Sequence, residues 1–162
     1  MEGTVEAVLE DHTRLIATPI GTMIATADEH GITSLDFTDK TFPAALSEYP
    51  LLLQLEEELG DYFAGNRRTF TLPLAPQGTP FQKKVWETLR TIGYGETISY
   101  TEEAQRFGNS KAVRAVAGAN ARNPISILIP CHRVIASGGG IGGYSGGIWR
   151  KAFLLELERK GI

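Results

Sequence analysis

A short stretch rich in proline and glycine, residues 73–78, constrains the fold more than any other feature, because the chain changes character across it. Residues 1–76 carry 4 Lys and Arg against 13 Asp and Glu, whereas residues 77–162 carry 12 against 6. The basic balance of the second half is typical of nucleic-acid binding, although an uneven solvated surface would give the same counts.

The sequence predicts a mixed α/β protein with two domains of unlike composition. Its 162 residues suffice for one large domain or two small ones, and a hydrophobic content of 42% can supply real cores. We expect an N-terminal α/β scaffold domain at 1–72, a linker at 73–78 and a mainly helical C-terminal domain at 79–162.

The first half begins with alternating apolar and polar residues. Residues 14–18, 22–26 and 32–37 predict three strands joined by tight turns. Leucine and aromatic residues then recur at helical spacing over 43–64, which predicts an amphipathic helix, and 70–72 predicts a last short strand. This half shows no cluster of catalytic residue types and is interpreted as a scaffold.

The second half begins with signals for helix starts. Thr79 is a predicted N-cap with proline at the next position, and Ser99 with Glu102 fits a capping box that predicts a short helix. A tight turn at 108–110 separates that helix from a second one at 111–120. Helix, short turn and helix form the outline of a helix-turn-helix, which by itself is a weak indication of DNA binding.

The second of these helices is the candidate DNA-contacting element. It is crowded with small residues, which let a backbone approach another surface closely, and core packing is the alternative reason for them. The small residues are Ala115, Ala117 and Gly118, and the basic residues on and just after the helix are Lys111, Arg114 and Arg122.

The chain beyond this helix alternates between buried patterns and loops. Asn123 and the proline that follows it end the helix, and the apolar residues 126–129 predict a buried strand. Residues 137–147 contain seven glycines and predict a loop, and residues 149–160 predict a final helix with Phe153 facing inward.

The only cysteine, Cys131, follows the predicted buried strand directly. Cationic or imidazole groups lower the pKa of a thiol, and His132 and Arg133 supply both types. His132 could act as a base through a water, with Glu156 or Glu158 as its acidic partner. An inert core cysteine is the alternative interpretation, and these neighbours argue against it.

The glycine loop is interpreted as a flexible wall of a ligand site. Its formal G-x-G-x-x-G match does not lie on a strand-to-helix turn of a βαβ unit, so we reject a dinucleotide site. Tyr144 and Ser145 lie between glycine pairs, where an aromatic face and open backbone amides could hold a flat ligand. A mere surface loop is the alternative.

Several other function classes are excluded by the sequence. One cysteine cannot form an internal disulfide, and together with three scattered histidines it shows no metal-ligand spacing, so no metal is expected. No apolar run is long enough to span a membrane, and the N-terminus has no signal-peptide pattern. We therefore expect a cytoplasmic protein without a membrane partner.

Residues 123–134, which read N-P-I-S-I-L-I-P-C-H-R-V, resemble the active-site signature of the O6-alkylguanine-DNA alkyltransferases, or methylated-DNA–protein-cysteine methyltransferases. The likeness extends over 78–158 and includes Gly143-Tyr144-Ser145-Gly146-Gly147. It implies an N-terminal domain similar to ribonuclease H and a helical C-terminal domain with a helix-turn-helix. It also implies stoichiometric, irreversible transfer of alkyl groups from the O6 of guanine, and the O4 of thymine, to the cysteine.

The resemblance implies a role for each matching residue. Cys131 would accept the alkyl group, His132 would deprotonate it through a water, and Glu158 would orient His132. Asn123 would be the hinge between the helix-turn-helix and the active site, and Arg114 the finger that replaces the flipped nucleotide.

Further residues would bind the substrate, again by resemblance. Tyr100 would press on the phosphate beside the target, and Asn120 would lie in the alkyl pocket. Tyr144 and Ser145 would contact the guanine ring, and the carbonyl of Val134 would face its amino group.

The partner implied by the resemblance is double-stranded DNA, bound through its minor groove by a monomer that needs no cofactor. The zinc ligands that some relatives carry in the N-terminal half are absent. Two alternatives remain: a non-catalytic module that only binds alkylated DNA, and a Cys-His hydrolase or acyltransferase. The first would not need Cys131, and the second would not explain Arg114.

Overall fold

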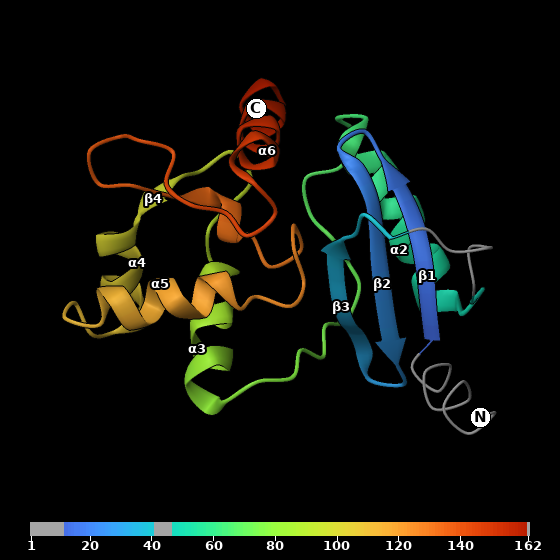
Figure 1. Ribbon diagram of the computed structural model, residues 1–162, viewed down its shortest axis with the longest axis horizontal. Coiled ribbons are helices and arrows are strands. Elements are labelled where there is room, and N and C mark those ends of the chain that lie inside the picture. Colours follow the sequence, from blue (N-terminus) through green and yellow to red (C-terminus); the bar gives the residue numbers. More distant parts are fainter. Residues whose placement is uncertain (1–11, 41–46, 162) are drawn as a thin grey trace. The chain divides into compact units, whose positions relative to one another are not determined.

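The computed structural model describes residues 12–40 and 47–161 (Figure 1). The chain divides between Pro76 and Gln77 into two compact units. Among the residues that the model describes, no helix is long and apolar enough to cross a membrane. Each unit has its own buried apolar core, so each is described by itself below.

The first unit is a three-stranded antiparallel sheet with one helix against it (Figure 1). Strands β1 (His12–Thr18), β2 (Gly21–Asp28) and β3 (Gly31–Phe37) lie in sequence order, which confirms the three predicted strands. Helix α2 (Pro50–Phe63) packs on them. Its apolar stripe meets inward-facing strand residues in a core that includes Ile16, Met23, Ala25, Leu35, Leu52, Leu55 and Leu59.

The structure corrects one prediction for this unit, and part of a second prediction lies outside the described residues. Helix α2 begins at Pro50, and residues 43–46 of the predicted helix lie outside the described residues. The predicted strand at 70–72 is wrong, because the backbone N–H of Thr71 donates to the Glu58 carboxylate on α2. The chain pairs with β3 only afterwards, in a single parallel bridge between Ile32 and Leu74.

The second unit contains the predicted helix-turn-helix. Helix α3 (Pro80–Leu89) starts with the predicted N-cap, and the strands β4 (Ile98–Ser99) and β5 (Val134–Ile135) form a short parallel pair. Helix α4 (Tyr100–Phe107) and helix α5 (Val113–Ala121) follow β4 and confirm the two predicted helices.

Local contacts explain why these helices start, stop and pack as they do. The Ser99 hydroxyl accepts the backbone N–H of Glu102 at 3.0 Å, and Gly108 ends α4 with a left-handed φ of 108°. The indole N–H of Trp86 on α3 donates to the Ala119 carbonyl at 2.9 Å. This bond fixes α5 against α3. The face of α5 that points away from α3 is exposed.

The segment that leads to the cysteine is not the predicted strand. Residues 126–129 form buried turns, in which Ile127 has a positive φ of 73° and Ile129 N–H bonds the Ile125 carbonyl at 3.0 Å. These local hydrogen bonds leave no backbone row to pair with a neighbouring strand. Cys131 then begins a short 3-10 helix, η1 (Cys131–Arg133).

The final helix, α6 (Ile148–Lys160), carries an unusual inward face. Leu154 is fully buried as expected, but Phe153 is 38% exposed, so its predicted inward orientation is wrong. The other fully buried positions on α6 are polar: Lys151 and Glu158 are exposed by 0% and 1%. Buried charges of this kind need partners, and these partners lie at the candidate active site.

Candidate active site

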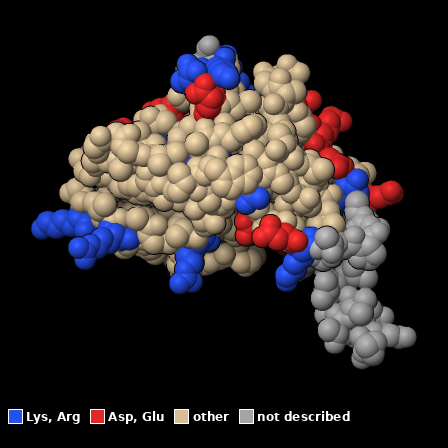
Figure 2. Space-filling view, turned by 45° about the horizontal axis from the view of Figure 1, so that its top comes forward, with Lys and Arg blue, Asp and Glu red and all other residues tan. Residues whose placement is uncertain are grey.

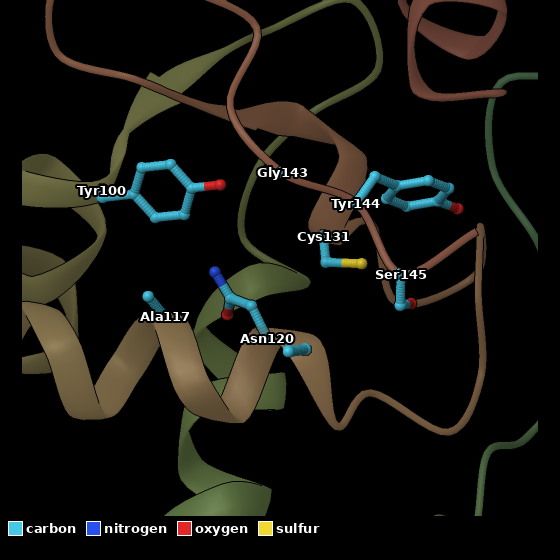
Figure 3. A pocket seen from close by; sticks show the side chains of 8 residues that line it. Tyr100, Ala117, Asn120, Cys131, Gly143, Tyr144 and Ser145 are labelled. Atoms are coloured by element: carbon cyan, nitrogen blue, oxygen red, sulfur yellow. The ribbon is translucent and has the colours of Figure 1, made fainter. Parts of the chain in front are cut away.

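A cavity of about 390 Å³ in the second unit has the only cysteine in its wall (Figure 3). Helices α4 and α5, the 3-10 helix η1 and the glycine loop each contribute to this wall. The lining residues are Tyr100, Ala117, Asn120, Ala121, Cys131, Gly143, Tyr144 and Ser145. Five residues predicted to form the site (Tyr100, Asn120, Cys131, Tyr144 and Ser145) are therefore brought together around one cavity.

Asn123 connects the end of α5 to the thiol. Its Nδ2 donates to the Ile129 carbonyl at 2.8 Å and to the Cys131 Sγ at 3.3 Å, while its Oδ1 accepts the Ile125 N–H at 2.9 Å. These three bonds hold the turn between α5 and η1 in one conformation. The position of Asn123 thus matches the expectation of a residue that links the helix-turn-helix to the active site.

The environment of Cys131 differs from the sequence expectation. Burial raises the pKa of the thiol to about 11, although the Asn123 hydrogen bond and the Lys151 charge both act to lower it. The prediction that the neighbouring residues lower this pKa is therefore wrong. Arg133 points elsewhere, because its guanidinium bonds the Glu158 carboxylate and the Ile92 carbonyl. The resting thiol keeps its proton and needs a base.

His132, the next residue in the chain, is the predicted base, and its ring is held by Glu158. Its Nε2 lies 2.8 Å from the Glu158 Oε2, and both side chains are buried. Because a carboxylate only accepts hydrogen bonds, Nε2 carries the ring proton and Nδ1 is the free acceptor. Nδ1 has no hydrogen-bond partner within 12–40 and 47–161. Burial lowers the pKa of His132 against the opposing pull of Glu158, so the ring is neutral and can take up a proton.

Glu158, not Glu156, is the acidic partner. Burial alone would raise the pKa of Glu158, but hydrogen bonds and charges from His132 and Arg133 outweigh it and hold this pKa far below its ordinary value. Glu158 also accepts two bonds from Arg133, at 2.9 and 3.0 Å, and the Gly95 N–H at 3.2 Å. Glu156 is exposed and pairs with Arg159.

Lys151 is a site residue that the sequence reasoning missed. Its Nζ is fully buried and donates to the carbonyls of Val134 at 2.6 Å and Gly143 at 2.9 Å. Burial lowers the pKa of Lys151 to about 8, and its charge favours a thiolate at Cys131. Lys151 lies two helical turns before the predicted Glu158, on the same face of α6, and this spacing could have revealed it.

Glu103 on α4 is a second buried group that the sequence reasoning missed. Its Oε1 accepts a hydrogen bond from Asn120 Nδ2 at 2.7 Å. Burial raises the pKa of Glu103 to about 7, and the bond from Asn120 only partly offsets this effect. The capping-box pattern singles out Glu102 and gives no signal for Glu103, yet Glu102 is exposed and Glu103 has 0% exposure.

The glycine loop closes over the cavity and needs a glycine to do so. Gly142 has a φ of 78°, and a Cβ at this position would lie 2.9 Å from the Tyr100 hydroxyl. Tyr144 is half-buried and Ser145 exposed, as expected for residues that would meet a ligand. Val134 is fully buried and does not line the cavity, and its carbonyl accepts the Lys151 ammonium.

The residues expected to contact DNA lie on the outer face of α5 and at its ends. Lys111, Arg114, Ala115, Gly118 and Arg122 are exposed, and Ala117 is half-buried in the cavity wall. A second hollow of about 370 Å³ separates this face from the start of α3. Figure 2 shows Lys and Arg side chains along its lower left edge, on the side that carries α4 and α5 in Figure 1.

The part of the chain described by the structure contains no group of three or more His, Cys, Asp and Glu side chains that could hold a metal ion. The reactive groups described at this site are the thiol of Cys131, the imidazole–carboxylate pair of His132 and Glu158, and the buried ammonium group of Lys151. Such a set can generate a nucleophilic sulfur and move one proton.

Comparison with known proteins gives a consistent result for both units. Residues 80–160 match the family model of the 6-O-methylguanine DNA methyltransferase DNA binding domain. Residues 12–76 match that of the 6-O-methylguanine DNA methyltransferase ribonuclease-like domain. The expected fold, a ribonuclease-H-like α/β domain followed by a helical domain with a helix-turn-helix, is confirmed.

Relatives cover nearly the whole chain. It is 44% identical to the constitutive methylated-DNA–protein-cysteine methyltransferase of Bacillus subtilis, over 88% of this chain and 92% of that protein. It is 42% identical to the Methanosarcina acetivorans methylated-DNA–protein-cysteine methyltransferase, over 89% of this chain and 96% of that protein.

Solved structures agree with the sequence relatives. The crystal structure of Mycobacterium tuberculosis O6-methylguanine methyltransferase superposes with a TM-score of 0.83 at 40% identity, covering 93% of this chain and 94% of that chain. Its counterpart in complex with DNA gives a TM-score of 0.84 at 41% identity, covering 92% and 93%. The chain therefore belongs to the 6-O-methylguanine DNA methyltransferase family.

Proposed function

We propose that this protein repairs alkylated DNA by moving the alkyl group of O6-alkylguanine, and of O4-alkylthymine, onto Cys131. The observation that carries this proposal is the placement of one buried thiol in the wall of a base-sized cavity, next to a neutral His132 backed by Glu158. The protein is a methylated-DNA–protein-cysteine methyltransferase that acts once.

The transfer is a displacement at the alkyl carbon. His132 Nδ1 takes the thiol proton through a water, and the Cys131 sulfur attacks the carbon attached to O6. A sulfur–carbon bond forms, the carbon–O6 bond breaks, and its electron pair leaves with guanine, which recovers a proton from the imidazolium. A thioether is a poor leaving group, so the alkyl group stays on the sulfur.

Lys151 and Asn123 support this step at the sulfur. Both favour the thiolate, Lys151 by its charge and Asn123 by its hydrogen bond to Sγ. Burial outweighs both effects in the resting protein, so the removal of the Cys131 proton depends on His132 as the base. The ammonium group of Lys151 also fixes the glycine loop, because it donates a hydrogen bond to the Gly143 carbonyl.

DNA enters across the outer face of α5. The small residues Ala115 and Gly118 are exposed, so the helix can approach a narrow groove closely, and Lys111 and Arg122 offer charges to phosphates. The target base turns out of the stack into the cavity, where Tyr144 and Ser145 meet it, whereas the Val134 carbonyl is bonded to Lys151.

Two residues manage the base flip in this proposal. Arg114 is exposed on α5 and fills the place of the flipped nucleotide, and Tyr100 at the start of α4 presses on the neighbouring phosphate. We propose a monomer that acts in the cytoplasm, because chemistry at a free thiol needs a reducing compartment. The first unit, with its linker at 73–78, serves as scaffold.

The decisive experiment measures the mass of the protein after incubation with duplex DNA that contains O6-methylguanine. We expect each protein to gain the mass of one methylene group, located at Cys131 by peptide mapping, with a plateau at one transfer per protein. Binding without a gain in mass would support the non-catalytic module instead. Repeated turnover without a stable adduct would support a Cys-His hydrolase.

Arg114→Ala should slow the repair of duplex DNA far more than the reaction with free O6-benzylguanine. The free base needs no flip, whereas the duplex lesion costs a few kcal/mol to unstack, which the inserted side chain partly offsets. We expect a loss of about tenfold or more in duplex, measured as single-turnover rates. Lys111→Ala is the matched control, because it also removes one positive charge but leaves the side chain that is proposed to insert into the duplex. Equal losses of Arg114→Ala on both substrates would refute the finger assignment.

A further inference from the structure

Asn120 in the cavity wall and its hydrogen-bond partner Glu103 form a buried polar pair that the transfer reaction does not use. Asn120 lies on α5 with 8% exposure, and Glu103 lies on α4 with none. Figure 3 shows the Asn120 side chain reaching from α5 toward the space between Tyr100 and Cys131. Asn120 and Cys131 therefore line the same cavity, so an O6 substituent that extends past the sulfur along α5 would meet Asn120.

The hydrogen bonds of this pair are incomplete. Asn120 Nδ2 donates to Glu103 Oε1 at 2.7 Å, but Asn120 Oδ1 and Glu103 Oε2 are buried without a hydrogen-bond partner in the described part of the chain. A buried acceptor without a donor costs free energy, and a site with such an acceptor favours ligands that supply the donor. The remaining wall of α5, Ala117 and Ala121, offers only methyl groups.

We propose that Glu103 and Asn120 form a specificity determinant for the O6 substituent, in which Glu103 holds the Asn120 carboxamide so that the cavity prefers substituents ending in a hydroxyl group over apolar ones of equal length. Glu103 is a positioning residue, because it acts through Asn120. The proposal rests on the alkyl-transfer function and names the substrate class of that site.

The chemistry of the pair explains why both members are needed. An asparagine alone could rotate its carboxamide to suit any neighbour, and its preference for a hydroxyl group would be weak. The bond to Glu103 removes that freedom before the substrate arrives.

The test compares single-turnover transfer from two duplexes that differ only in the lesion, O6-(2-hydroxyethyl)guanine and O6-propylguanine. These substituents have equal numbers of heavy atoms, and their different intrinsic reactivities cancel when the rate ratio is compared between proteins. We expect the hydroxyethyl-to-propyl ratio to be about fivefold higher in the wild type than in Asn120→Leu, as for one hydrogen bond. Glu103→Leu should lower the ratio in the same direction, while Glu103→Gln should retain it.

Glu102→Leu is the matched control, because it removes an exposed carboxylate from the same helix and should leave the ratio at the wild-type value. Equal ratios in the wild type and Asn120→Leu overturn the proposal, and a wild-type ratio in Glu103→Leu overturns the role of Glu103. Should Glu103→Leu fail to fold, Asn120→Leu and Glu103→Gln still decide. A duplex with O6-methylguanine runs beside each protein, and failure of the wild type there refutes the proposed function instead.

Discussion

Cys131→Ala abolishes methyl transfer and leaves binding to O6-methylguanine DNA largely intact. The sulfur is by far the strongest nucleophile among the side chains that line the cavity, so the adduct falls from one per protein to none. The side chain lost is small and lies away from the exposed face of α5, so DNA affinity changes little. Mass spectrometry and a gel-shift titration measure the two quantities on the same samples.

Cys131→Ser sharpens this prediction, because a hydroxyl group keeps the size of the side chain but is a much weaker nucleophile. It should also show no adduct within the time that the wild type needs for completion. Ser137→Ala, in the exposed part of the glycine loop, should transfer at the wild-type rate. An adduct in Cys131→Ala would identify another acceptor and refute the mechanism.

The elements that could be predicted from the sequence are those whose local pattern agrees with their environment. The three strands of the first unit alternate because one face of their sheet packs on α2. Helix α3 was predictable because Thr79 and Gln82 form a complete capping box. The predicted site residues came from the resemblance to a family motif, and five of the nine predicted catalytic and substrate-binding residues line one cavity.

The elements that could not be predicted are those set by tertiary contacts. An apolar run such as 126–129 fits a buried strand or a buried turn equally well, and only the lack of a partner strand decides. Likewise, adjacent cations do not lower the pKa of a cysteine when one of them turns away, as Arg133 does toward Glu158. The roles of Lys151 and Glu103 depend on burial, which charged residues rarely show and sequence patterns do not reveal.

Glu158→Gln should destabilise the protein severely and stop repair. Glu158 is 1% exposed, and its carboxylate receives hydrogen bonds from His132, from two nitrogens of Arg133 and from the Gly95 N–H. Glutamine has a similar shape but no charge, and its amide nitrogen would face donors. Breaking a buried ion pair at one partner costs about 3–5 kcal/mol, because the other charge stays buried. Urea unfolding followed by fluorescence measures the loss.

Acid should lower the folding stability of the wild type, because it protonates the same Glu158 carboxylate. The folded-state pKa of Glu158 lies far below its unfolded value of about 4.3, so its contribution is fully present above that value and is lost as the pH falls through and below it. Glu158→Gln has no such group, so the difference in unfolding free energy between the two proteins should shrink from neutral pH toward pH of about 3. A constant difference across this range would show that the carboxylate is not held ionised.

The control for this prediction lies on the same helix. Glu156 is exposed and pairs only with neighbours on α6, Arg159 and Lys160, so Glu156→Gln should unfold at the wild-type urea concentration and transfer methyl groups at the wild-type rate. If both variants unfolded and transferred methyl groups alike, the bonds of Glu158 to His132 and Arg133 would contribute no more to stability or transfer than the exposed ion pairs of Glu156. If only Glu158→Gln lost transfer, and lost it even at low temperature where it remains folded, the carboxylate would act on catalysis as well as on stability. That outcome is the one expected, because without the Glu158 carboxylate nothing fixes the proton on His132 Nε2 or stabilises the imidazolium that forms as the thiol gives up its proton.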